Sequence, residues 1–202
     1  ATKGGNIVFN AGNVPLGSSK EGGNIKMMAG SGDISKGGNI NIMSGRSNSV
    51  GGAIVAKSMD TNVGSSGTLS LISGDASVGA SGNVAMKTGS AAGTSGSIGI
   101  LAGNSDAGIS GNIVMKAGKS MSQTGGSLNF VSGASDAGLS GSIAFQIGKG
   151  NLGGNIVIDT GDSSEKESGD INLSTGASTT KTGSINVVAK PTAGEGGAVT
   201  IE

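Results

Sequence analysis

Aliphatic residues recur in this chain at a short interval, each time just after a pair of small residues. The pair is Gly-Gly, Ser-Gly or, once, Thr-Gly, and one residue separates it from Ile, Leu or Val. A repeat this short is typical of one turn of a solenoid, in which each coil buries its apolar face on the next. Successive copies start 13 to 18 residues apart, at Gly4, Gly22, Gly37, Gly51, Ser66, Ser81, Ser95, Ser110, Gly125, Ser140, Gly153, Ser168, Thr182 and Gly196.

Within one copy, apolar and polar residues alternate with the period of a strand. After Ser110-Gly111, the residues Ile113 and Met115 fall on one side of an extended backbone, and Val114 falls on the other. Gly118 then ends the alternation and predicts a corner. The first aliphatic residue of each copy forms a predicted core ladder: Ile7, Ile25, Ile40, Ile54, Leu69, Val84, Ile98, Ile113, Leu128, Ile143, Ile156, Ile171 and Ile185.

These observations predict an all-β chain that forms a single parallel β-solenoid. We expect about 14 flattened coils of 13–18 residues around a core of stacked Ile, Leu, Val, Met and Phe, as one continuous domain over residues 1–202. The dipeptides Asn-Gly and Asp-Gly, which mark tight antiparallel hairpins, do not occur, and this favours parallel stacking over a meander. Neither end carries an evident cap, so we expect further coils or head-to-tail copies to cover the ends.

Composition excludes several other classes of protein. Gly accounts for 42 of 202 residues, but Pro for only 2, and Gly does not recur at every third position, which excludes a collagen helix. Hydrophobic residues make up only 34% of the chain, yet their regular placement argues against disorder. The formal net charge is zero, so we expect neither nucleic acid nor a membrane as partner.

The residues that usually carry catalysis are scarce. The chain has no His and no Cys, which excludes the common Ser-His and Cys-His nucleophiles and the usual zinc sites. It has three Phe and no Trp or Tyr to stack on a sugar, and Phe9, Phe130 and Phe145 all fall on the inward side of the predicted strands. We therefore expect no enzyme, no catalytic residue, no cofactor and no metal.

Two columns of polar residues could suggest ligands, but both have a simpler interpretation. Asp75, Asp106 and Asp136 stand singly in loops, whereas calcium-binding β-rolls share the ion between carboxylates of successive turns. We interpret these residues as solvated. A second column is interpreted as side-chain amides that hydrogen-bond along the stack: Asn6, Asn24, Asn39, Asn83, Asn112 and Asn155.

The outward side of the predicted strands is more apolar than a solvated face requires. Near the corner, Lys alternates from copy to copy with an apolar residue, as at Lys57 and then Ile72. The alternation separates like charges, and Lys at these places serves solubility or a binding stripe. Exposed apolar atoms are common on any protein, which is the competing interpretation. Lateral contact with another chain or segment is predicted for Met28, Met43, Ile72, Leu101 and Val131.

Two segments carry a resemblance to a known class of repeats. Ser110-Gly111-Asn112-Ile113-Val114-Met115-Lys116-Ala117-Gly118 and Ser168-Gly169-Asp170-Ile171-Asn172-Leu173-Ser174-Thr175-Gly176 resemble the Gly/Ser-rich tandem arrays of large secreted or surface proteins of protists and algae, and of viral and phage fibres. The resemblance implies an extracellular or cell-surface rod with a structural or adhesive role. The sequon that begins at Asn172 is compatible with secretion and glycosylation.

The sequence thus predicts a non-enzymatic structural protein that forms or joins an extracellular filament, sheath or appendage by end-to-end and lateral packing. Its expected partners are copies of itself, as a homopolymer, or neighbouring coils of a longer chain. Other hypotheses are an ice-binding or glycan-binding, adhesin-like solenoid, and a passive stalk or spacer. An ice-binding face usually shows repeated Thr, whereas the outward columns here mix Lys, Asn, Val, Met, Ser and Asp.

Overall fold

The structure is a computed structural model that describes residues 4–15, 17, 19–164, 167–190 and 197–201. The chain divides into two compact units, Ala1–Gly99 and Ile100–Glu202. Each unit is described by itself below. The prediction of one continuous domain over residues 1–202 stays a prediction, and Gly196, where the last predicted copy begins, lies outside the described residues.

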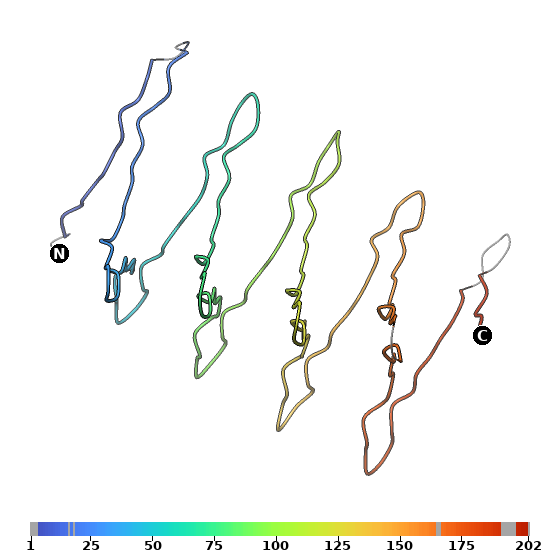
Figure 1. The fold of residues 1–202 in the computed structure, drawn as a ribbon. Coiled ribbons are helices and arrows are strands. Elements are labelled where there is room, and N and C mark those ends of the chain that lie inside the picture. Colours follow the sequence, from blue (N-terminus) through green and yellow to red (C-terminus); the bar gives the residue numbers. More distant parts are fainter. Residues whose placement is uncertain (1–3, 16, 18, 165–166, 191–196, 202) are drawn as a thin grey trace. The chain divides into compact units, whose positions relative to one another are not determined.

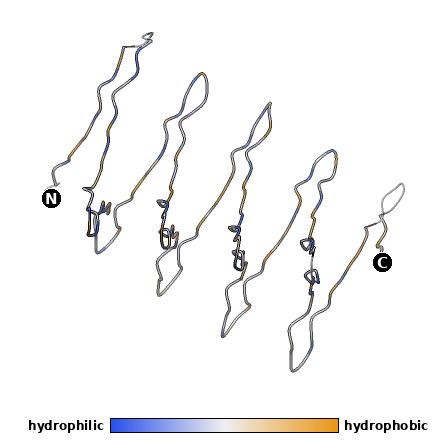
Figure 2. Ribbon diagram, in the orientation of Figure 1, coloured by the Kyte–Doolittle hydropathy of each residue, from blue (hydrophilic) through white to orange (hydrophobic). Residues whose placement is uncertain are grey.

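In each unit, extended segments alternate with loops (Figure 1). We call each extended segment a run: it starts at the pair of small residues and ends just before a glycine that we call the corner glycine. Residues 81–88 with Gly89 are an example from the first unit, and residues 110–117 with Gly118 from the second. Apolar residues recur along the runs (Figure 2).

Several loops are closed by hydrogen bonds between glycines. At each closure, the glycine in the second place of a small pair donates its N–H to the carbonyl oxygen of the preceding corner glycine, over a donor–acceptor distance of 2.9 to 3.1 Å. The repeated sequence therefore produces a repeated loop closure. The bonded pairs are Gly23 with Gly12, Gly38 with Gly30, Gly52 with Gly45, Gly111 with Gly103, Gly126 with Gly118, and Gly141 with Gly133.

Close packing at the base of the loop explains why the second residue of the pair is glycine. A Cβ atom at Gly126 would lie 3.2 Å from the backbone nitrogen of Gly118 and 3.3 Å from Cβ of Ala117. Such distances are tighter than ordinary van der Waals contact, so a side chain at this position would push the two runs apart. The residue before this corner is small, and Ala117 is among the least exposed residues that the structure describes.

Serine side chains stabilise several loops by accepting hydrogen bonds from the loop backbone. The hydroxyl oxygen of Ser105 accepts a hydrogen bond from the Gly108 N–H at 2.8 Å, and Ser135 accepts one from Gly138 at 2.9 Å. Ser120 does the same for the N–H of Gln123, at 2.8 Å. Each of these serines stands two places after a corner glycine. Such side-chain bonds to nearby backbone stabilise turns in place of ladder hydrogen bonds.

The predicted β-solenoid is wrong for this chain. No helix and no strand occurs within the described ranges, so the structure does not support an all-β class. The backbone hydrogen bonds found there close loops and do not join one run to another along its length. The alternating pattern correctly suggested an extended backbone, but a strand also needs a neighbour to bond with, and other coils of the same chain do not provide it.

The expected core of stacked aliphatic residues is likewise missing. In the part of the chain that the structure describes, no side chain is buried. The residues of intermediate exposure are mostly the small ones that precede corner glycines, such as Ala11, Ala29 and Ala102. The closest packing therefore lies at the bases of the loops rather than along the runs.

Candidate interaction surface

The two sides of a run differ in exposure. In the run 110–117, Ile113 is 50% exposed, whereas its neighbour Val114 is 82% exposed. The difference recurs: the predicted ladder residues other than Ile7 are 48% to 60% exposed, and the predicted lateral residues are 72% to 89% exposed. The first aliphatic residue of a run is thus partly shielded, whereas the predicted lateral residues are open.

The structure does not gather either set into a packed site. All thirteen ladder residues and all five lateral residues are exposed in this single chain. Their assignment to a core and to lateral contacts stays a prediction. Asn172 is also exposed, so its side chain is accessible for modification.

Two phenylalanines of the second unit form an aromatic contact. The rings of Phe130 and Phe145 pack edge to face, with centroids 6.5 Å apart and an angle of 86° between the ring planes. This geometry is one that aromatic pairs prefer. The two residues hold the same position in consecutive runs, two places after Leu128 and Ile143. That shared position is the signal in the sequence that could have paired them.

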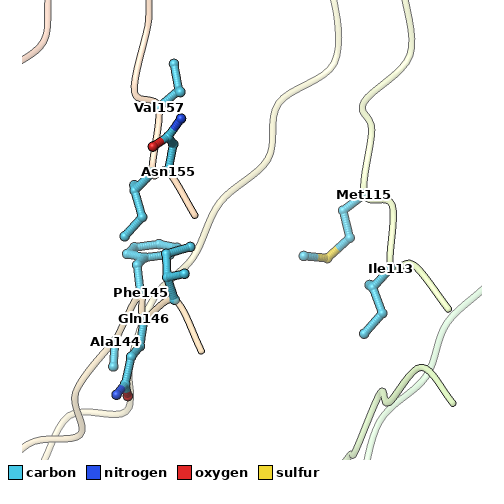
Figure 3. A pocket seen from close by; sticks show the side chains of 9 residues that line it. Ile113, Met115, Ala144, Phe145, Gln146, Asn155 and Val157 are labelled. Atoms are coloured by element: carbon cyan, nitrogen blue, oxygen red, sulfur yellow. The ribbon is translucent and has the colours of Figure 1, made fainter. Parts of the chain in front are cut away.

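An open groove of about 740 Å³ lies beside this aromatic contact. In Figure 3, Ile113 and Met115 reach toward it from one run, and Phe145 and Asn155 lie across it on others. Most of the side chains around it are apolar. The groove is lined by Ile113, Met115, Ala144, Phe145, Gln146, Ile147, Asn155, Ile156 and Val157.

The ion pair between Lys57 and Asp60 contributes little to the stability of the structure. The Lys57 ammonium bonds to a carboxylate oxygen of Asp60 at 2.9 Å, but the two side chains are 59% and 86% exposed, and such exposed pairs add little stability. Among the described residues, no group of three or more His, Cys, Asp or Glu side chains could hold a metal ion. No helix in that same part of the chain is long and apolar enough to cross a membrane.

The described surface offers contacts for association with another polypeptide. Apolar side chains and backbone groups that bond to no other run are presented together along the runs, and both are groups that another polypeptide can cover. No known protein family, curated protein or solved structure matches this chain.

Proposed function

We propose that this chain is a non-enzymatic structural protein whose copies assemble with one another into an extracellular filament, sheath or appendage. The observation that carries the proposal is the amount of surface left open. The accessible surface of the chain is 20891 Å². A folded monomer of 19.1 kDa exposes about 8,400 Å², and the fully extended chain about 27,700 Å².

The chain is therefore locally ordered but far from having covered its apolar surface. Hydrophobic burial is the main favourable term in folding and in most protein association. A chain that leaves side chains such as Ile113, Leu128 and Ile156 about half exposed gains little of that term alone. Association with other chains would bury these side chains and supply the missing hydrophobic stabilisation.

Identical copies suit this role better than an unrelated partner. The same small pair and aliphatic residue recur in every run. A run of one copy can therefore meet a run of another copy that has a similar surface. The formal net charge of zero means that copies do not repel each other strongly at neutral pH.

Electron microscopy of the purified chain tests the proposal. We expect negatively stained samples to show elongated assemblies, and sedimentation to show species heavier than one chain. A soluble, monodisperse single chain at every concentration tested contradicts the proposed function.

The extracellular location has a separate test. Passage through a eukaryotic secretory pathway should add a glycan at Asn172, because the sequon is exposed. We expect a mass shift that the variant Asn172→Gln lacks. An unmodified chain recovered from the medium removes this support for a secreted protein.

A further inference from the structure

Beyond the small pair, the backbone of the runs makes no hydrogen bond within the part of the chain that the structure describes. In the run 110–117, the residues from Asn112 to Ala117 make no hydrogen bond to any other described residue. A folded protein makes roughly one internal hydrogen bond per residue, and most of them join backbone groups. The loops at both ends of this run are closed by glycine hydrogen bonds, whereas both edges of the run beyond Gly111 are open. Open edges of this kind are templates for pairing with another chain.

Two runs of the second unit do not pair with each other, because an open groove lies between them. Paired strands lie about 4.8 Å apart, which leaves no empty space between their backbones. Here, by contrast, a groove of about 740 Å³ separates two runs. One run carries Ile113 and Met115, and the other carries Ile156. A groove of this size between two extended runs leaves room for a further extended segment.

We propose that runs of other copies of this chain lie between runs that an open groove holds apart and hydrogen-bond to them edge to edge, with one such run in the groove beside Met115 and Phe145. The proposal rests on the proposed self-assembling function and specifies how the copies meet. It differs from the rejected solenoid, in which coils of the same chain stack directly on each other. Here the backbone partners belong to different chains.

The side chains around the groove fit a copy of the same sequence. Ile113 and Met115 on one side, and Phe145 and Ile156 on the other, would meet the Ile, Leu, Met or Phe residues of an inserted run. Gln146 and Asn155 offer amide groups beside the apolar ones, and amides can bond to matching amides of a copy. A run kept in register would thus place like residues beside like residues.

The area to be covered supports contact along the whole length of the chain. The chain exposes roughly 12,000 Å² more than a folded monomer of its mass. A standard interface between two proteins buries only about 1,600 Å² in total. Contact at the chain ends alone would therefore leave most of the excess uncovered. Copies that interleave along every run would cover it.

Interleaving makes folding and association one process. We therefore expect the melting temperature of the assembly, followed by circular dichroism, to rise with protein concentration. Light scattering should give particles that contain two or more chains. A folded single chain whose melting temperature is independent of concentration overturns the proposal.

Mixed isotope labelling tests the pairing directly in the natural sequence. Chains labelled with ¹⁵N and chains labelled with ¹³C are unfolded, mixed, refolded together and studied by solid-state NMR. We expect correlations between amide nitrogens of one chain and carbonyl carbons of another within the runs, including residues 112–117. Filaments that form without such correlations overturn the interleaved arrangement and leave the proposed function standing, whereas absence of any assembly defeats both.

A pair of variants at the groove adds a matched control. Ile113 lines the groove, whereas Ile109 stands in the preceding loop and is 97% exposed. We expect Ile113→Asp to lose the assembly and Ile109→Asp to retain it. Equal assembly by both variants counts against a copy in the groove. If Ile113→Asp is simply unfolded, the isotope experiment on the natural sequence decides.

Discussion

Phe130 and Phe145 meet edge to face across the base of a closed loop. Their ring centroids are 6.5 Å apart, and the runs that carry them are joined by the loop in which Gly141 bonds to Gly133 at 2.9 Å. The aromatic contact and the glycine closure thus fix the same corner from two sides. In a chain with so few other side-chain contacts, this corner is a well-defined point of its tertiary structure.

The contribution of the aromatic contact can be measured by a double-mutant cycle. We expect Phe130→Ala and Phe145→Ala to be coupled by about 0.5–1.5 kcal/mol, the usual range for an aromatic pair. Denaturant unfolding of the natural chain, both single variants and the double variant, all at one protein concentration, gives the coupling. Strictly additive effects show that the rings do not interact in the folded state.

The loop closure predicts different effects for two glycines in one loop. Gly126→Ala places a Cβ 3.2 Å from the nitrogen of Gly118, so we expect the free energy of unfolding to fall by roughly 1–3 kcal/mol. Gly118→Ala meets nothing within 4 Å and should cost far less. Denaturant midpoints of the two variants provide the comparison. A larger loss for Gly118→Ala than for Gly126→Ala contradicts the packing described at the loop base.

The sequence predicted these local features better than it predicted the fold. The alternation of Ile113, Val114 and Met115 correctly indicated an extended run with two different sides, and Gly118 correctly marked its end. Periodicity reports which residues share a side, because it follows from backbone geometry alone. It carries no information on which chain supplies the hydrogen-bond partners, and the prediction of a single-chain solenoid failed at that step.

The serines of the loops illustrate a second difference. A small residue stands two places after several corner glycines, as at Ser105 and Ser120, and small size by itself favours close packing. In the structure, the hydroxyl oxygens of these residues accept backbone hydrogen bonds. Ala and Ser are equally small, so size alone could not reveal this role. The groove beside Phe145 was not predictable either, because its walls come from runs well separated in the sequence.

Removal of a loop serine should therefore weaken one loop. In Ser120→Ala, the N–H groups of Ser122 and Gln123 lose the hydroxyl that accepts from them, at a cost of about 0.5–1.5 kcal/mol. We expect faster hydrogen exchange at the Gln123 amide. Ser122→Ala is the matched control, because the Ser122 hydroxyl makes no hydrogen bond that would be lost. Equal exchange at Gln123 in the two variants argues against the serine bond.

A proline substitution in a run distinguishes a chain that folds alone from a chain that pairs with its copies. Val114 lies in the middle of the run 110–117, and its backbone N–H bonds to no described residue of its own chain. Proline has no N–H, and within paired strands it removes a hydrogen bond of the ladder. In an isolated chain, Val114→Pro would break no bond. Between interleaved copies, it would break one bond in every chain.

We therefore expect Val114→Pro to lower the melting temperature of the assembly clearly more than Val114→Ala does. Both variants replace the same valine side chain, which is 82% exposed, and Val114→Ala controls for its loss, so an additional effect of proline reports on the backbone. Circular dichroism and light scattering at matched concentration provide the measurement. If both variants assemble and melt alike, the backbone of this run has no hydrogen-bond partner in the assembly, and the copies must meet through side chains alone.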